Sequence, residues 1–233
     1  MNYQNILYII IFVLLAFLVI LFFVNWFSVS NENFSMCNYD HLILPENDIS
    51  TLRELLLKLV AFFNSNNIRY FAIGGTLLGI ERNGGLMPFD DDIDLGILNE
   101  DTNKIDEYKD DDFYFTNAFF GYKFKKKDND RMFIDIMIFE KVNNVYKIIQ
   151  NNFPEEYFYE NELFPLKEKT FSGIISLSVP HDYISYLNRS YKNYDKEIKL
   201  QNSHFETTDR YNSLPKSFDV NYDNGKYLCY TKL

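Results

Sequence analysis

An uninterrupted apolar segment near the N-terminus constrains this chain more than any other feature of its sequence. Ile6 to Val24 is a run of 19 apolar or aromatic residues with no charge among them. A helix of about 20 such residues is long enough to cross the hydrocarbon core of a bilayer. A cleaved signal peptide is the alternative, because Ser28 to Ser30 form a small-x-small triplet, but no basic residue precedes the run as it does in such peptides. We therefore expect an uncleaved single-pass anchor over residues 1–28, with residues 6–27 in the membrane.

The rest of the chain has the composition of one folded, acidic domain. We expect a short polar stem over residues 29–47 and a domain over residues 48–233. The whole chain is 47% hydrophobic, which excludes a disordered chain of the low-hydrophobicity kind. With 33 acidic and 23 basic residues, its net charge is −10. We therefore expect no nucleic-acid partner, and expect an anionic ligand to need local help such as a metal ion.

Cysteines and glycosylation motifs say little about the compartment of the domain. The two cysteines, Cys37 and Cys229, are too few for a disulfide framework or a Cys-based zinc site. Whether they pair with each other stays open. Two Asn-x-Ser motifs, at Asn33 and Asn188, favour a lumenal or extracytoplasmic domain of the ER or Golgi kind.

Hydrophobic periodicity in the soluble part predicts an α/β or α+β domain around a mixed sheet. Thr51 to Glu54 form a capping box ahead of apolar residues at helical spacing. A short apolar strand then ends at Gly74 and Gly75, where the backbone must turn sharply or approach another group closely. Lys125 to Asp130 form a charged, solvated tip between two strand-like stretches. In chain order we expect a helix, two strands, a hairpin and a helix, over residues 51–63, 68–73, 93–97, 113–139 and 182–194.

Aspartates interleaved with strand residues are the strongest functional signal. Side chains alternate between the two faces of a strand, so Asp92 and Asp94 point the same way while Ile93 points into the core. Their mutual repulsion is relieved by a divalent cation, and oxygen ligands favour Mg²⁺ or Mn²⁺. Asp135 lies between apolar residues, where a charge is expensive to bury without compensation. A neighbouring strand would bring it to the pair and complete a three-acid site.

A solvated acidic loop is the alternative interpretation of such a run. Asp110 to Asp112 follow a polar, charged stretch and are expected to be such a loop. Asp92 and Asp94 differ because apolar strand residues surround them. Within the first run, we expect Asp91 to face away from the pair.

The stretch around these acids resembles the signature of a known family. Gly75 to Gly96 reads Gly-Thr-Leu-Leu-Gly-Ile-Glu-Arg-Asn-Gly-Gly-Leu-Met-Pro-Phe-Asp-Asp-Asp-Ile-Asp-Leu-Gly. It resembles the LicD/fukutin family, in which a Gly-Thr-Leu-Leu-Gly segment leads through an Arg and a Gly to Pro-Trp-Asp-Asp-Asp-Ile-Asp; Phe89 stands here where the family has Trp. Phe133 to Ile136 resembles the third acidic strand of the family, and residues 165–191 resemble its C-terminal pattern. The resemblance covers residues 50–205.

This resemblance implies a nucleotidyltransferase-like fold and a transfer reaction. Family members move a phospho-substituent, such as phosphocholine or ribitol phosphate, from a CDP-activated donor to a sugar hydroxyl of a glycan. By analogy, Asp92 and Asp94 would hold Mg²⁺ or Mn²⁺ on the donor diphosphate. Asp135 would be the third metal ligand or the base beside the attacking hydroxyl. The expected protein is therefore a minimal enzyme domain on an anchor.

Five further residues match the motif and are candidates for donor or metal binding. Gly74, Gly75 and Thr76 would let backbone N–H groups approach a phosphate. Arg82 would pair with a donor phosphate or brace the acidic cluster. Asp90 would support the metal ligands or bind a second ion.

Other functions are compatible with the same residues. One is a nucleotidyltransferase that attaches NMP to a small acceptor. Another is a catalytically inactive membrane or virion surface protein, although an inactive copy should have lost some of the acids. A glycosyltransferase of the GT-A type also uses Asp-x-Asp, but the Gly-Thr-Leu-Leu-Gly leader points elsewhere.

Overall fold

The structure, a computed structural model, describes residues 44–87, 90–150, 153–195, 197–199 and 217–219 of the 233-residue chain. All of them belong to one compact unit that spans Tyr39–Leu233. The expected anchor, both cysteines and Phe89 lie outside the described residues. Within these ranges, no helix combines the length and the apolar character that crossing a membrane requires.

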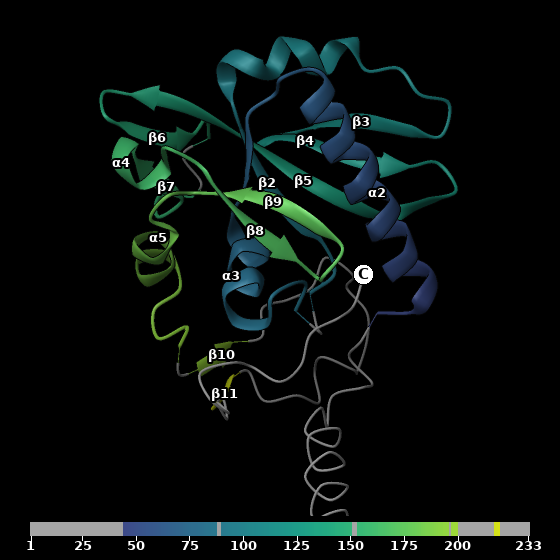
Figure 1. Cartoon of the computed structure of the whole chain (residues 1–233). Helices are drawn as coiled ribbons and strands as arrows, with labels where there is room; N and C mark the ends of the chain where they lie inside the picture. Colours follow the sequence, from purple (N-terminus) through teal and green to yellow (C-terminus); the bar gives the residue numbers. More distant parts are fainter. Residues whose placement is uncertain (1–43, 88–89, 151–152, 196, 200–216, 220–233) are drawn as a thin grey trace, which may run out of the picture. The chain divides into compact units, whose positions relative to one another are not determined.

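A mixed seven-stranded sheet forms the centre of the unit (Figure 1). Its strands, in spatial order, are β1 (Tyr70–Ala72), β2 (Ile93–Leu98), β5 (Asn129–Val142), β4 (Gly121–Lys126) and β3 (Phe113–Ala118), with β6 (Val145–Ile148) and β7 (Tyr157–Tyr159) attached beyond β5. β2 and β5 are parallel, and the other neighbouring pairs in this sheet are antiparallel. The expected mixed α/β architecture is confirmed.

Helices and a second hairpin pack around this sheet. α2 (Glu46–Ser65) crosses β4 and β5, and α3 (Gly74–Asn83) joins β1 to β2 (Figure 1). A hairpin of β8 (Lys167–Phe171) and β9 (Ile175–Val179) packs beside β1. The remaining elements are the 3-10 helix η2 (Asn99–Glu107), α4 (Glu160–Leu163), α5 (Tyr183–Ser190) and the strand pair β10 (Glu197–Lys199) and β11 (Ser217–Asp219).

The first helix begins earlier than its capping box predicts. The carbonyl of Pro45 accepts a hydrogen bond from the N–H of Asp48 at 2.9 Å, which places the helix start at residue 46. Thr51 lies inside the helix, where its hydroxyl donates to the carbonyl of Asn47 at 2.9 Å. The capping-box prediction is therefore wrong: the helix starts directly after Pro45, and Glu46 and Asp48 in its first turn interact favourably with the helix dipole. Residues 46–47, expected in the stem, belong to the helix.

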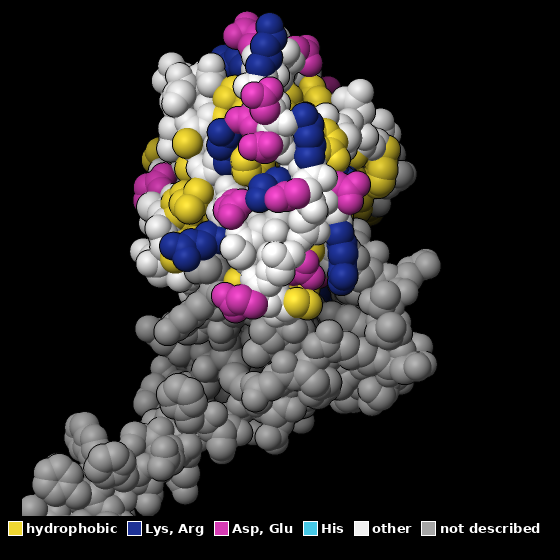
Figure 2. All heavy atoms as spheres, turned by 90° about the vertical axis from the view of Figure 1, so that its right-hand side faces the viewer, with side chains coloured by type: hydrophobic (Ala, Val, Ile, Leu, Met, Phe, Trp, Pro, Cys, Tyr) yellow, Lys and Arg dark blue, Asp and Glu magenta, His cyan; other side chains and the backbone are white. Residues whose placement is uncertain are grey.

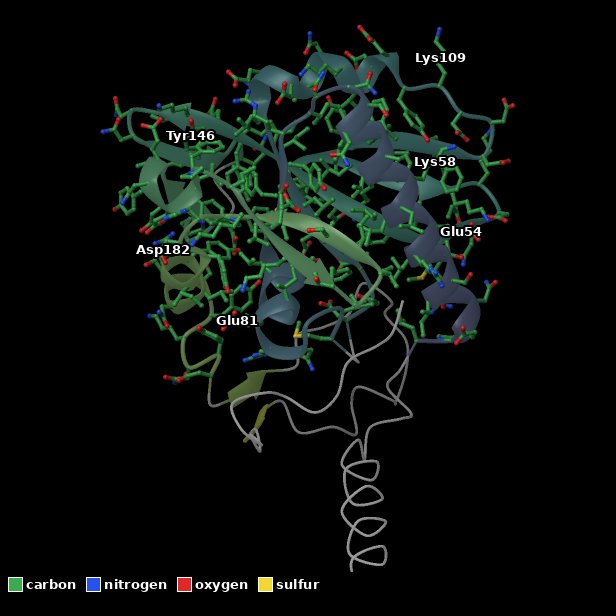
Figure 3. The ribbon with its side chains drawn as sticks, in the orientation of Figure 1. Glu54, Lys58, Glu81, Lys109, Tyr146 and Asp182 are labelled. Carbon is green, nitrogen blue, oxygen red and sulfur yellow. The ribbon has the colours of Figure 1, made fainter. Side chains whose placement is uncertain are left out.

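Charged pairs fix the exposed side of α2 to the edge of the sheet. Lys58 contacts Asp110 at 2.6 Å, and Glu54 contacts Lys126 at 2.8 Å. Figure 3 shows Glu54 and Lys58 along this side of the helix. On the face drawn in Figure 2, basic and acidic side chains lie among one another rather than in a patch of one sign.

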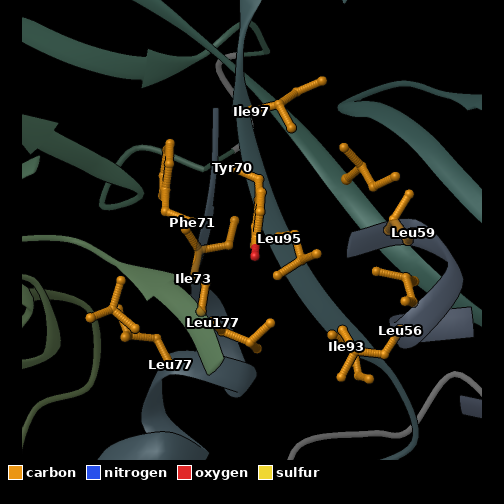
Figure 4. Close-up of a cluster of buried hydrophobic side chains, with 14 of the residues drawn as sticks. Leu56, Leu59, Tyr70, Phe71, Ile73, Leu77, Ile93, Leu95, Ile97 and Leu177 are labelled. Carbon is orange, nitrogen blue, oxygen red and sulfur yellow. The ribbon is translucent and has the colours of Figure 1, made fainter. Parts of the chain in front are cut away.

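One part of the apolar core lies between the sheet and α2 (Figure 4). Ile93, Leu95 and Ile97 alternate along β2 and are fully buried. Leu56 and Leu59 of α2 lie against this face. The opposite face of β2 carries Asp94, so strand alternation separates the core from the acids as the sequence predicts.

Aromatic rings fill the acid-bearing face beyond Asp94. Phe71, Phe139 and Phe158 pack against one another with ring centroids 5.3 to 5.8 Å apart. A Cβ on Gly96 would lie 2.6 Å from the ring of Phe71, so only glycine lets the cluster reach the sheet. The acids lie at the end of this face that the aromatic cluster does not cover.

Two local predictions differ from the structure. Residues 74–83 form α3 rather than a turn and a loop, because three glycines in one short helix conceal its pattern. The stretch 113–124 is not a single arm of the hairpin: β3 and β4 are separate strands joined by a turn at Phe119 and Phe120. Two apolar residues give no turn signal, which is why the sequence conceals that turn.

Candidate active site

Three carboxylates meet where β2 and β5 begin to pair. Asp94 and Asp135 are direct Cα partners in the parallel register, and Asp92 precedes β2 by one residue. One oxygen from each of the three carboxylates lies within 4.8 Å of the others. Asp92 and Asp135 are only 6% and 3% exposed. The structure thus brings together the three acids predicted as a metal site.

The start of α3 orients Asp94. The N–H of Gly75 donates to Asp94 Oδ2 at 2.9 Å. The N–H of Asp94 donates to the hydroxyl oxygen of Thr76 at 2.7 Å, and Thr76 is buried. Two residues predicted to bind the donor therefore fix the position of the acid.

Both glycines at the start of α3 permit a close approach of carboxylates. Gly74 has a φ of +54°, and a Cβ there would lie 2.6 Å from Asp94 Oδ2. A Cβ on Gly75 would lie 2.8 Å from Asp90 Oδ2. The N–H of Gly74 donates to the hydroxyl of Tyr186 at 3.0 Å. Both glycine N–H groups therefore have acceptors within the protein, and their approach to a donor phosphate stays a prediction.

Asp90 adds a fourth carboxylate to the same space. Its Oδ2 atom is buried without a hydrogen-bond partner. Burial, together with the nearby charges of Asp94 and Asp91, raises the pKa of Asp90 to about 8. Asp91, expected to face away, is buried and groups with Asp90 and Asp92 but not with the Asp94 and Asp135 pair.

Crowding of these acids makes the ionised state of Asp94 unfavourable. Burial and the charges of Asp92 and Asp135 raise the pKa of Asp94 well above its ordinary value. A divalent cation would offset this repulsion. The donor set consists of oxygens alone, which Mg²⁺ and Mn²⁺ prefer, and the buried, unpartnered Oδ2 of Asp90 would gain a charge partner. The residues therefore fit such an ion.

A lysine completes the charge distribution. Lys123 lies opposite Asp135 in the antiparallel pair of β4 and β5, and its Nζ is 2.7 Å from Asp135 Oδ1. The same Nζ lies 3.6 Å from the centre of the Phe133 ring. Lys123 was not among the site residues predicted from the sequence. Strict alternation of Tyr122 and Phe124 with lysines was the signal that could have placed it on the acid-bearing face.

Comparison with known proteins places this geometry in a family. Residues 67–182 match the family model described as LicD/FKTN/FKRP, nucleotidyltransferase domain. These residues belong to the LicD/fukutin family. Their bounds include the acids of both groups and Lys123, so the expected family resemblance is confirmed over the part of the chain that forms the site.

Relatives of the LicD domain include bacterial and animal proteins. The uncharacterized protein RT0683 of Rickettsia typhi is 33% identical over an alignment of 174 residues, which covers 69% of this chain and 52% of that protein. The ribitol 5-phosphate transferase FKRP of Mus musculus is 26% identical over an alignment of 162 residues, which covers 64% of this chain and 33% of that protein. The chain therefore aligns with only part of the length of these relatives.

One solved structure resembles the fold weakly. The antibiotic-resistance factor ANT(2'')-Ia has a TM-score of 0.39 and 16% sequence identity, over 60% of this chain and 73% of that one. A likeness at this level carries no argument about function.

Residues outside the acidic motif complete the surroundings of the acids, and two of them, Tyr186 and Tyr191, lie beyond the matched LicD segment. The hydroxyl of Tyr186 in α5 accepts the N–H of Gly74 and donates to the carboxylate of Glu156. Burial and the charges of Glu156 and Asp94 raise the pKa of Tyr191 well above its ordinary value. The sequence analysis assigned no role to Tyr186 or Glu156. Neither is part of a motif, and only the fold brings α5 to the acids.

Arg82 of the LicD domain is buried and ties α3 to the segment after α5. Its Nε donates to the main-chain carbonyl of Tyr194 at 2.9 Å.

The lysines expected at a solvated hairpin tip have different partners in the structure. Lys126 pairs with Glu54 and Asp128, whereas Lys125 lies over the Phe133 ring. The described contacts of these two lysines do not include the acids of the site.

Proposed function

We propose that this protein is a membrane-anchored, metal-dependent transferase of the LicD type. It would move a phospho-substituent, such as phosphocholine or ribitol phosphate, from a CDP-activated donor to a hydroxyl group of a glycan. The observation that carries the proposal is the convergence of Asp92, Asp94 and Asp135 within a segment that belongs to the LicD/fukutin family. The similarity to the ribitol 5-phosphate transferase FKRP supports the substrate class.

The chemistry of such a transfer suits the arrangement of these side chains. A divalent cation would supply charge neutralisation at the donor phosphates, the main requirement of displacement at phosphorus. Gly75 and Thr76 hold Asp94 in one orientation, so the carboxylate needs no reorganisation when substrate binds. Asp135 would be a ligand of the cation or accept the proton of the attacking hydroxyl, because it lies at the same point of the sheet.

Nucleotide binding tests this proposal directly. The full-length protein in detergent should bind CDP in Mg²⁺ or Mn²⁺ and lose nearly all binding in EDTA, because an acidic site repels a free diphosphate. Calorimetry with CDP, UDP, ADP and GDP, each with and without metal, makes the measurement. Preference for UDP would favour the glycosyltransferase interpretation. A folded protein that binds no nucleotide would favour an inactive surface protein.

Attachment of NMP to a small acceptor is the second candidate, because the matched family model is named a nucleotidyltransferase domain. The two reactions consume different donors. Incubation with CDP-choline or CDP-ribitol should release CMP if the first proposal holds. Consumption of CTP or ATP with release of pyrophosphate would support the second.

The anchor and its topology belong to the same proposal. The 19-residue apolar run from Ile6 to Val24 supports a single membrane span, and the motifs at Asn33 and Asn188 support an extracytoplasmic domain. Expression in a eukaryotic cell should yield a membrane-bound protein whose apparent mass falls on glycosidase treatment. A soluble, secreted product that begins near Asn31 would show a cleaved signal peptide instead.

A further inference from the structure

A single row of side chains crosses three neighbouring strands on the acid-bearing face. Lys123 of β4 pairs with Asp135 of β5, and Asp135 pairs with Asp94 of β2. Because paired residues point to the same face, the ammonium group lies at one end of the row and Asp94 at the other. The lysine is thus built into the same sheet as the metal-ligating candidates.

Two aromatic rings hold the lysine in place and leave part of it accessible. Its Nζ lies 3.6 Å from the ring centre of Phe133 and 5.5 Å from that of Phe120. The side chain of Lys123 is 24% exposed, whereas that of Asp135 is 5% exposed. The lysine side chain is therefore more accessible than the acid that it contacts, both to solvent and to a ligand that enters the site.

Stability alone is a weak explanation for this pair. A largely buried ion pair is often no more stabilising than apolar residues of similar volume, because both charges lose hydration. The charges around Lys123 would also change when metal and donor bind. A cation bound by Asp135 would share the partner of the ammonium and repel it, while a diphosphate would bring anionic oxygens to the same place.

We propose that Lys123 is a phosphate-contacting residue of the site: its ammonium group holds the Asp135 carboxylate in the structure seen here and binds a phosphate oxygen of the donor when metal and donor are present. The proposal rests on the proposed function, whose acids and metal it uses. It adds a side chain of the protein that contacts the donor phosphate. It also assigns the role expected of the glycine N–H groups, which have other partners, to a side chain on β4.

Metal and pyrophosphate binding, measured separately, test this role. Lys123→Met should bind pyrophosphate in Mg²⁺ about 10- to 100-fold more weakly than the parent, the effect of losing one charge-assisted hydrogen bond. The same variant should bind Mn²⁺ alone at least as tightly as the parent, because a competing positive charge is gone. Lys123→Arg should retain pyrophosphate binding. If Lys123→Met does not fold, the pyrophosphate affinity of Lys123→Arg tests the proposal in its place.

Lys125→Met is the matched control, because Lys125 lies two residues further along the same strand. It contacts the Phe133 ring as Lys123 does, but its partner on β5 is Phe133 rather than Asp135. It should bind both probes as the parent does. Equal pyrophosphate affinity in Lys123→Met and the parent would overturn the proposal, as would a parallel loss of Mn²⁺ and pyrophosphate binding, which marks a purely structural ion pair. A parent that binds pyrophosphate but no CDP would refute the proposed donor and leave the role of Lys123 intact.

Discussion

The two aspartate runs, Asp90 to Asp92 and Asp110 to Asp112, have the same composition and opposite electrostatic surroundings. The first run lies at the buried entry to β2, where burial and neighbouring carboxylates raise the pKa of Asp90 to about 8. In the second run, a hydrogen bond from Lys58 and backbone N–H groups lower the pKa of Asp110 to about 2. A run of acids alone therefore does not identify a site, because burial and mutual repulsion of carboxylates distinguish the first run from the second.

The largest effect should come from the acid at the centre of the first run's site. Asp94→Asn should reduce transfer activity by about 10²- to 10³-fold or more, because a metal ligand and its charge are lost. In EDTA, its melting temperature should equal or exceed that of the parent, because repulsion from Asp92 and Asp135 is relieved. Asp111→Asn, in the exposed second run, is the control. Equal Mg²⁺-induced melting shifts in Asp94→Asn and the parent would contradict a metal role for Asp94.

The close approach of α3 to the acids predicts the next effect. A Cβ on Gly75 would lie 2.8 Å from Asp90 Oδ2 and 3.4 Å from Asp94 Oδ2, so Gly75→Ala should push these carboxylates apart. We expect Mn²⁺ binding to weaken about tenfold, or about 1.4 kcal/mol. Gly84→Ala, at the other end of the same helix, has open space around it but a φ of +71°. It should destabilise the fold by about 1–2 kcal/mol and leave Mn²⁺ binding unchanged.

The two runs should also respond to pH in opposite directions. The folded pKa of Asp90, about 8, exceeds its ordinary value of 3.8, so its stabilising contribution is complete below pH 3.8 and is lost as the pH rises through 8. In EDTA, the melting temperature should therefore fall from pH 5 to pH 8, and Asp90→Asn should flatten this fall. For Asp110, with a folded pKa of about 2, the contribution is present above pH 3.8 and is lost as the pH falls through 2. If the melting temperature in EDTA instead rose from pH 5 to pH 8, and Asp90→Asn removed that rise, the raised pKa of Asp90 would be contradicted.

The smallest effect belongs to the exposed pair of the second run. Lys58→Met removes the 2.6 Å contact with Asp110, and surface pairs contribute about 0–1 kcal/mol. Chemical denaturation should show a loss within that range that disappears at high salt. Mn²⁺ binding should not change. A larger loss of stability would show that the pair contributes more than a surface pair does. Any change in Mn²⁺ binding would show that the second run is coupled to the site.

The central sheet is easier to predict from the sequence than the helices around it. Alternation along β2 is strong enough to separate Ile93, Leu95 and Ile97 from Asp94 by local pattern alone. The helix α3 escapes such a prediction because glycine has a poor intrinsic helix propensity. At Gly74 and Gly75, the carboxylates of Asp94 and Asp90 occupy the space of a side chain, and this contact is made only when the chain folds back after α3.

The candidate site is predictable where a motif carries it and hidden where only the fold does. Asp92, Asp94 and Asp135 follow from their apolar neighbours and the family resemblance. Lys123 is hidden because its partner lies on another strand, and Tyr186 because α5 returns to the acids from outside the matched segment. Pairings between distant parts of the chain leave little trace in local pattern.

The row of Lys123, Asp135 and Asp94 has a consequence for the order of folding. β4 and β5 form a local hairpin, but β2 and β5 pair in parallel, and η2, β3 and β4 lie between them in the chain. Closing such a long loop is slow compared with forming a hairpin. The acids of β2 and β5 therefore come together only when this long-range pairing is made. A divalent ion held by both strands would bind only molecules in which they have paired, and its uptake during refolding would time the closure of the β2 and β5 pair.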